Sequence, residues 1–548
     1  MSTPLARVPG AAALADAELV EVPAAALLGY EQIRCETQTL ARTQLVLKEN
    51  DCFLLTDAAG NITPPGACDL GFFHRDTRVL SHYELVTAGG PPDVLSSQAA
   101  RVFASQIDLT VTDREFGGVF TEPKNFLHIR REQLLDTFLT DRFILTNYMG
   151  RPVEFWLELR FAADFADIFE VRGARRPQRG QYFRPIIGER EVCWCYRGLD
   201  GRLRRTLIRF TVAPEVLESH RARWSFRLHP KDSVELEVWI TPLLDDAWAP
   251  PPDRPYVERF GQVRASYERW REESTHFRSD DEFFNAALRQ AITDLRALMV
   301  EIDGRPIVAA GIPWFVAPFG RDSLITALQM MMFSPELARD TLRFLAQYQG
   351  KKDDDWTEEE PGKILHELRF GEMARLGESP HTPYYGTVDA TPLFVVTFSE
   401  LMAWFGSPHL FEEFLPAAEA AIGWIERYGD RNRDGFVDYG QRSRRGLVHQ
   451  NWKDSHNSLQ FPDQSPITAP IAPVEVQGYV YQAKLALADL LQRYGDEAQR
   501  MQAVRLRNEA RQLQERFERR FWIESEGFYG QAIDGSGRPV PALRSNPG

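Results

Sequence analysis

The sequence predicts a chain in two parts, an N-terminal antiparallel β-sandwich followed by a helical domain. Up to about residue 250, short alternating apolar runs such as Val153–Leu159 and Val234–Ile240 are separated by turn residues, a pattern typical of strands in a sandwich. Beyond that point apolar side chains recur every three or four residues, as in Asp281–Val300, which favours amphipathic helices. The proline run in Ala249–Asp253 separates the two patterns, because proline continues neither a helix nor a strand ladder.

These patterns predict four segments along the chain. We expect a flexible N-terminal lead over residues 1–30, the sandwich over 31–250, a charged linker helix within 251–280, and the helical domain over 281–548. A long loop over 350–388 interrupts the helices, and loops of that length in a compact domain are usually functional. The predicted helices cover residues 256–275, 281–300, 321–333, 335–349, 389–405, 410–428, 474–494 and 497–521.

The composition argues against several classes of protein. The chain has 548 residues and a formal net charge of −14, which argues against a nucleic-acid partner, because proteins that bind a phosphate backbone concentrate positive charge. No apolar stretch is long enough to cross a bilayer and the start of the chain lacks the basic region of a signal peptide, so we expect a cytoplasmic protein without a membrane partner. The odd, scattered cysteines do not resemble a disulfide framework, and we expect reduced, mostly buried thiols at Cys35, Cys52, Cys68, Cys193 and Cys195.

The first candidate site lies where Pro313–Ser323 leads into a helix. Trp314 and Phe319 stand beside the charged pair Arg321 and Asp322. A sugar needs this combination, an aromatic face for its apolar side and charged groups that hydrogen-bond its vicinal hydroxyls. The alternative is that Asp322 caps the helix and Arg321 is its surface partner, and the residues alone leave both interpretations open.

The long loop holds a second concentration of functional groups. Glu367 follows His366, but this is not a metalloprotease pair, because Phe370 occupies the position of the second histidine. Tyr385 and Asp389 follow in the same loop. Asp389 by itself is better explained as the N-cap of the next helix, and it is the density of polar groups in one loop that favours a site.

The segment Asp430–Asp438 resembles a calcium-binding loop in its Asp-x-Asn-x-Asp-Gly core. Gln441 stands where a calcium loop has its closing acid, and Arg431 and Arg433 place positive charge inside the loop. We therefore expect a turn held by its own side chains rather than a metal site.

Two later motifs complete the candidate residues. Asp454 follows Trp452 and Lys453, and an apolar wall raises the pKa of a carboxyl group as a general acid requires. Glu475 and Gln477 lie at the start of a helix. The alternatives are a capping or ion-paired role for Asp454 and a first-turn acid favoured by the helix dipole for Glu475.

Taken in order, these motifs resemble a known group of enzymes. Gly71–Ser81 resembles the hallmark of the N-terminal domain of bacterial glycogen-debranching-enzyme-like proteins. Phe319–Ser323, Tyr385–Thr391, Trp452–Ser455 and Glu475–Tyr479 resemble the catalytic domain of amylo-α-1,6-glucosidase-like enzymes, which belongs with the glucoamylase, trehalase and mannosylglycerate-hydrolase-like group. The resemblance extends from about residue 30 to the end of the chain.

The resemblance implies an (α/α)6 toroid after the β-sandwich and an inverting glycoside hydrolase that cleaves α-linked glucosyl units. One carboxylic acid then protonates the leaving oxygen while a second carboxylate activates water. By position, Asp454 is the general acid, and no metal or organic cofactor is needed. The implied substrate-binding residues are Trp314, Phe319, Arg321, Asp322, Glu367, Tyr385, Asp389, Trp452, Lys453, Glu475 and Gln477.

One feature departs from the family pattern. In the family the general base is a glutamate late in the toroid, and the predicted helices of this chain are fewer than the twelve that a six-hairpin toroid contains. We therefore expect a C-terminally incomplete toroid and assign no general base.

Two alternatives keep the sugar pocket but change the function. The first is a hydrolase of small glycosides such as glucosylglycerate, mannosylglycerate or a disaccharide, in which Arg442, Arg444 and Arg445 bind the acceptor carboxylate; these arginines are equally explained as a solvated basic loop. The second is a carbohydrate-binding protein without turnover. The expected partner is an oligosaccharide or small glycoside in each case, and the sequence does not predict the oligomeric state.

Overall fold

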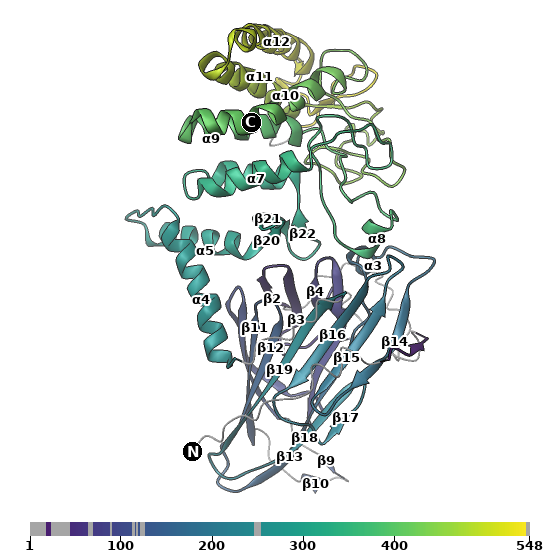
Figure 1. Ribbon diagram of the computed structural model, residues 1–548, viewed down its shortest axis with the longest axis vertical. Coiled ribbons are helices and arrows are strands. Elements are labelled where there is room, and N and C mark those ends of the chain that lie inside the picture. The colour runs from purple at the N-terminus through teal and green to yellow at the C-terminus, as the bar shows by residue number, and fades with distance from the viewer. Residues whose placement is uncertain are drawn as a thin grey trace.

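The computed structural model describes residues 18–23, 44–63, 69–87, 90–111, 115–116, 119–120, 126–245 and 254–543. These residues form a sheet-rich N-terminal domain and a helical C-terminal domain stacked end to end (Figure 1). Of the predicted N-terminal lead, only residues 18–23 are described, and two of them form the short strand β1. The proline run Ala249–Asp253, the cysteines Cys35 and Cys68, and the last five residues lie outside the described part.

The N-terminal domain is built on one large antiparallel sheet. Its nine strands lie in the order β1-β14-β15-β16-β19-β12-β11-β8-β7. Short turns connect the neighbours β14-β15, β15-β16, β11-β12 and β7-β8, whereas the other neighbouring pairs are joined by longer connections. The strands are β1 (Glu21–Val22), β7 (Asp93–Arg101), β8 (Ala104–Thr110), β11 (Leu127–Leu135), β12 (Leu139–Asn147), β14 (Gln181–Ile187), β15 (Glu191–Arg197), β16 (Leu203–Phe210) and β19 (Ser233–Leu244).

Two four-stranded antiparallel sheets pair with the large sheet through a shared hydrophobic core. The core joins side chains such as Phe72 and Leu157 of the small sheets to Ile129 and Leu236 of the large one. Along each strand, successive side chains point alternately into this core and away from it. This explains the alternation of apolar and polar residues in the sequence. The sheets have the orders β17-β18-β13-β6 and β2-β3-β4-β5. Their strands are β2 (Gln44–Glu49), β3 (Cys52–Asp57), β4 (Gly71–His74), β5 (Thr77–Leu80), β6 (His82–Thr87), β13 (Val153–Ala162), β17 (Val216–Leu217) and β18 (Arg221–Leu228); β9 (Glu115–Phe116) and β10 (Val119–Phe120) pair separately.

The helix α4 (Tyr256–Glu273) lies along the side of the N-terminal domain and leads into the helical one (Figure 1). Its residues Tyr256, Val263 and Tyr267 pack with Phe103, in the turn between β7 and β8, and with Leu134 of β11. The predicted linker helix therefore buries an apolar stripe on the sheet, and the two domains are joined by packing as well as by chain.

The helical domain is centred on α9 (Ala390–Phe405). Most of its residues are buried, because α6, α7, α10 and α11 all pack against it. A helix that is hydrophobic on all sides has this central position. The other elements of the domain are α5 (Glu282–Leu298), α6 (Gly320–Met330), α7 (Pro335–Gln347), α8 (Glu372–Arg375), α10 (Pro408–Arg427), α11 (Val474–Tyr494) and α12 (Glu497–Phe521), with the short strands β20 (Met299–Ile302), β21 (Arg305–Gly311), β22 (Phe315–Pro318), β23 (Ala472–Pro473), β24 (Trp522–Ile523), β25 (Phe528–Tyr529) and β26 (Ala532–Ile533).

The predicted fold class, an N-terminal antiparallel sheet domain followed by a helical domain, is confirmed. The strands β20–β22 and the short helices α3 (Ile168–Val171) and α8 were not predicted. Cys52, Cys193 and Cys195 are buried free thiols, as expected. None of the helices in the described ranges is both long and apolar enough to cross a membrane.

Candidate active site

Three carboxylates surround one guanidinium group in the first turn of α6. Arg321 Nη1 donates a hydrogen bond to Asp389 Oδ2 at 3.1 Å. Arg321 Nη2 lies 3.7 Å from an oxygen of Asp322 and 3.7 Å from an oxygen of Asp454. Residues from three separate motifs of the sequence thus meet at one point, with more negative than positive charge.

The start of α6 is placed by a close backbone contact with the long loop. The Gly320 nitrogen donates to the His366 carbonyl at 2.8 Å, and a Cβ atom on Gly320 would lie 2.1 Å from the Leu365 carbonyl oxygen. Glycine is therefore required for the helix to begin here. Phe319 occupies the N-cap position without a side-chain capping bond, so Asp322 is not the helix cap that the alternative interpretation assumed.

Asp389 also has no capping role, although it directly precedes α9. Its side chain makes no capping hydrogen bond. One oxygen instead accepts from the Thr387 hydroxyl and the other from Arg321. Asp389 is fully buried, so its charge depends on the Arg321 guanidinium for compensation.

Asp454 and Asp322 are the open members of the cluster, with side chains that are each 39% exposed. Burial raises the pKa of Asp454; Arg321 opposes this shift, whereas Asp322 and Asp389 add to it. Burial likewise raises the pKa of Asp322, again against the effect of Arg321. The Asp322 Oδ2 atom is buried and accepts no hydrogen bond from the described residues. Both groups are therefore suited to receive or donate a proton or to bind a ligand hydroxyl.

Aromatic and basic side chains border this cluster. Trp452, beside Asp454, is 43% exposed. The Lys453 ammonium lies 4.6 Å from the centre of the Trp452 ring and 4.0 Å from a Glu475 oxygen. An exposed indole is suited to stack on the apolar face of a sugar ring.

Glu367 lies at the same site but in a different electrostatic state. Its two oxygens face the Arg369 Nε and the His381 Nε2, both at 2.9 Å. Burial acts to raise the pKa of Glu367, but the His381 ring and the Arg369 guanidinium oppose burial and hold this pKa well below its usual value. Burial lowers the pKa of the neighbouring His366 to about 4, so this imidazole is neutral near pH 7. Glu367 is a fixed anion, whereas Asp454 is a carboxyl group poised to be protonated.

The structure does not bring two of the predicted residues into the cluster. The Tyr385 hydroxyl donates to the Tyr348 carbonyl at 2.7 Å, and the ring packs in the hydrophobic core. Gln477 is 1% exposed, and its amide bonds the backbone of Val437 and Pro473. Both side chains stabilise loops beside the site rather than face it.

The remaining aromatics hold the motif in place. Trp314 packs against the core of the N-terminal domain, and its carbonyl accepts from Arg369 at 2.8 Å. Phe319 is buried edge-to-face against Phe315 and His366.

Three residues near the site were not among the substrate-binding residues predicted from the sequence. Tyr479 is half-buried, and Asp389 and Glu475 raise its pKa together with burial. Phe315 is 41% exposed, and the guanidinium of Arg172, at the end of α3, lies 5.3 Å from its ring centre. Phe315 and Tyr479 stood within quoted motifs, whereas nothing in the sequence around Arg172 distinguishes it from other surface arginines.

The Asp430–Asp438 loop is a turn held by its own side chains, as expected. Asp430 accepts from the backbone nitrogens of Asp434 and Gly435. Asp438 accepts from those of Arg431 and Asn432. Within the described ranges, no group of three or more His, Cys, Asp or Glu side chains is arranged to hold a metal ion.

Comparisons with known proteins agree with this architecture. Residues 47–239 match the family of N-terminal domains of some glycogen debranching enzymes. A putative kojibiose phosphorylase from the human microbiome superposes with a TM-score of 0.54 at 10% identity, covering 89% of this chain and 69% of its own. A bacterial glucoamylase complexed with acarbose superposes with a TM-score of 0.53 at 10% identity, covering 96% of this chain and 75% of its own. No curated protein sequence matches the chain.

At such low identity the two structures establish the fold and not the activity. The family match and these structures together confirm the resemblance expected from the motifs. The chain thus contains a region that matches the N-terminal domains of some glycogen debranching enzymes, and it shares its overall fold with the glucoamylase and the putative kojibiose phosphorylase.

Proposed function

We propose that the chain is a glycoside hydrolase that cleaves α-linked glucosyl units with inversion, and that Asp454 is its general acid. The observation that carries the proposal is the cluster itself. Two partly exposed carboxyl groups with raised pKa, Asp322 and Asp454, share one Arg321 guanidinium, and the exposed Trp452 stands two residues before Asp454 in the chain.

This cluster has the groups that glycoside cleavage requires. A carboxyl group with a raised pKa keeps its proton at higher pH and can donate it to the leaving oxygen. The Arg321–Asp322 pair offers donors and acceptors at fixed positions for vicinal hydroxyls. Trp452 and Phe315 present exposed aromatic surface to the apolar face of a sugar.

The comparisons support an α-glucosidic substrate. The N-terminal domain is of a type found in some glycogen debranching enzymes, and one structural relative was solved with acarbose bound. We therefore assign neutral α-glucosides, including the 1,6-linked branches of glycogen-like chains, as the substrate class.

The basic loop supports a neutral sugar over an acidic glycoside. Arg442 is paired with Asp353, Asp355 and Glu360. Arg445 donates to the Glu378 carbonyl. Two of the three arginines that a glycerate carboxylate would need are thus engaged with other parts of the chain.

We assign no general base, and the geometry argues against Glu367 and Asp389 in that role. Both oxygens of Glu367 and both oxygens of Asp389 already accept hydrogen bonds from side chains of the protein. This observation keeps a second candidate function, sugar binding without turnover, because losing general-base help costs about 10²–10⁴-fold in rate.

The test is sugar release from maltose, isomaltose, panose, branched dextrin, trehalose and glucosylglycerate, with and without inorganic phosphate. Asp454→Asn is the test variant, and Asp463→Asn is its control. Asp463 is an exposed aspartate that, like Asp454, lies between α10 and α11. The hydrolase predicts glucose release by the parent and the Asp463 control, with β-glucose as the first product of an α-glucoside, and loss of release in Asp454→Asn.

Two other results would redirect the proposal. Phosphate-dependent release of a sugar phosphate identifies a phosphorylase instead. Quenching of tryptophan fluorescence by these sugars without any release identifies the binding protein. Release that survives Asp454→Asn excludes Asp454 as the acid.

A further inference from the structure

The hallmark turn of the N-terminal domain reaches into the helical domain. Arg75 and Asp76, between β4 and β5, both have left-handed backbone conformations with φ of 45° and 61°. Such a turn is strained for residues with a side chain and persists where the surrounding contacts fix it. Its carboxylate, on Asp76, is buried and accepts from Arg369 Nη1 at 3.0 Å and from the Phe370 nitrogen at 2.8 Å.

Arg369 connects this turn directly to the candidate active site. Its side chain is 1% exposed, and its guanidinium makes further contacts with the helical domain. It donates from Nε to Glu367 at 2.9 Å and from Nη2 to the Trp314 carbonyl at 2.8 Å, and it lies 5.5 Å from the centre of the Phe319 ring. One buried side chain therefore touches the N-terminal domain and three predicted substrate-binding residues.

We propose that Asp76 and Arg369 are positioning residues through which the N-terminal domain orients the Glu367 carboxylate for sugar binding. This inference rests on the proposed function of the site. The planar guanidinium is suited to this role, because its donors lie in a rigid fork that fixes two acceptors relative to each other. Asp76 fixes the fork from one domain, and the fork fixes Glu367 in the other.

The surroundings of Glu367 explain why it needs the fixed cation Arg369. It faces Arg369, His366 and His381 on its own loop. It also interacts with the charges of Asp322 on α6 and Arg172 at the end of α3. The anion Asp322 repels Glu367, so without Arg369 the carboxyl group would gain a proton or turn away from the site.

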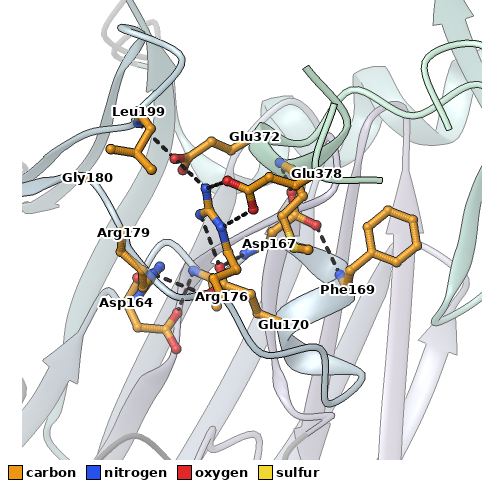
Figure 2. Close-up of polar contacts among 12 residues, drawn as sticks. Asp164, Asp167, Phe169, Glu170, Arg176, Arg179, Gly180, Leu199, Glu372 and Glu378 are labelled. Atoms are coloured by element: carbon orange, nitrogen blue, oxygen red, sulfur yellow. Dashed lines mark hydrogen bonds and ion pairs between the residues drawn. The ribbon is translucent and has the colours of Figure 1, made fainter. Parts of the chain in front are cut away.

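A second interdomain network provides a matched control. Arg176, from the loop after α3, lies between Glu372 and Glu378 with contacts of 3.0 and 2.7 Å (Figure 2). It docks the same loop of the helical domain onto the N-terminal domain. None of its ion pairs involves Glu367, so weakening it tests domain docking alone.

The experiment compares three variants of the full chain, each checked by circular dichroism for native folding. Arg369→Lys keeps the charge but loses the fork. The double variant Asp76→Asn/Arg369→Gln removes one negative and one positive charge together, so the net charge of the buried network does not change. Glu378→Gln is the docking control. The measurements are maltose and isomaltose binding by tryptophan fluorescence between about pH 4.5 and pH 7, and the titration of the Glu367 carboxyl carbon by NMR.

The parent and Glu378→Gln should show the same pH profile of sugar binding, because Glu367 stays ionised in both and the carboxyl groups of Asp322 and Asp454 are unchanged. In the double variant, the pKa of Glu367 should rise and binding should weaken at least about tenfold as pH falls through that pKa. Arg369→Lys should lie between them. The pKa of Glu367 rises rather than falls, because removing the Arg369 cation favours the protonated carboxyl group, which does not bind sugar.

Unchanged binding and an unchanged Glu367 titration in the folded double variant would overturn the proposal. Equal losses in the double variant and Glu378→Gln would also overturn it, because the effect would then belong to domain docking. A parent that binds neither sugar contradicts the proposed function, and in that case the Glu367 titration alone decides whether Asp76 and Arg369 position the carboxylate.

Discussion

Two clusters in this molecule each place three carboxylates around one arginine, yet they differ in how the charges are satisfied. Arg176 faces Glu170, Glu372 and Glu378, and its side chain is 1% exposed. Arg321 faces Asp322, Asp389 and Asp454. The number of charges is equal in the two clusters, so the number alone does not distinguish a structural ion network from a candidate active site.

The two clusters differ in the hydrogen bonds that the carboxylates accept from groups other than the shared arginine. Glu372 also accepts from the Tyr196 hydroxyl and the Leu199 nitrogen, at 2.9 and 2.8 Å. Glu170 lies 3.7 Å from Arg176 but accepts from the Asp167 nitrogen at 3.0 Å. Asp322 and Asp454 also lie 3.7 Å from their arginine, but both are 39% exposed. A carboxylate with all its acceptor positions filled holds domains together, whereas an underpaired one is available for a ligand.

The largest expected effect is on stability in the paired cluster. Arg176→Gln leaves three carboxylates without their shared cation, and breaking a buried ion pair from one side costs about 3–5 kcal/mol. Urea unfolding should show this loss in the free energy of unfolding. Maltose binding by the folded variant should stay within about twofold of the parent. A larger fall in binding would mean that the Arg176 network also shapes the site.

The corresponding change in the Arg321 cluster should lower the affinity for sugar more than it lowers stability. Arg321→Gln removes a charge-assisted donor, worth about 1.5–3 kcal/mol, so sugar affinity should fall roughly 10- to 100-fold. Fluorescence titration of the parent and the variant measures it. Unchanged affinity in a folded Arg321→Gln variant would show that the cluster is structural, like the one around Arg176.

Much of this fold was predictable from the sequence, because helix periodicity is a local signal. The predicted helices over 474–494 and 497–521 match α11 and α12 at both ends. The strands β20–β22 were missed, because they are short and lack the alternation of the N-terminal strands. Local pattern therefore located the long elements but not the short sheet that precedes the site.

The site was predictable as a set of motifs but not as a geometry. The motifs around Arg321, Asp389 and Asp454 do converge. Side-chain direction within a motif is set by tertiary packing, so the sequence did not predict that Tyr385 and Gln477 turn away. The contact between Asp76 and Arg369 spans 293 residues, and no local sequence pattern predicts a contact between residues so far apart in the chain.

A smaller effect, on the pH profile of activity, should distinguish the roles of Asp322 and Asp454, the two partly exposed carboxyl groups of the Arg321 cluster. Asp322→Asn removes a negative charge that raises the pKa of Asp454. A general acid works in its protonated form, so activity is lost as pH rises through its pKa. The alkaline limb of the kcat/KM profile should therefore move to lower pH in this variant. Asp463→Asn should leave the limb in place, and an unmoved limb in Asp322→Asn would argue that Asp454 is not the titrating acid.

The smallest expected effect tests whether full pairing stabilises the Arg176 cluster. Tyr196→Phe removes the hydroxyl that donates to Glu372 and accepts from the Gly180 nitrogen. Glu372 keeps its contacts with Arg176 and Leu199, so the free energy of unfolding should fall by only about 1 kcal/mol. Urea unfolding measures the loss, with maltose binding unchanged. If stability is unaffected, the second partners of Glu372 are dispensable, and exposure rather than pairing is what separates the two clusters.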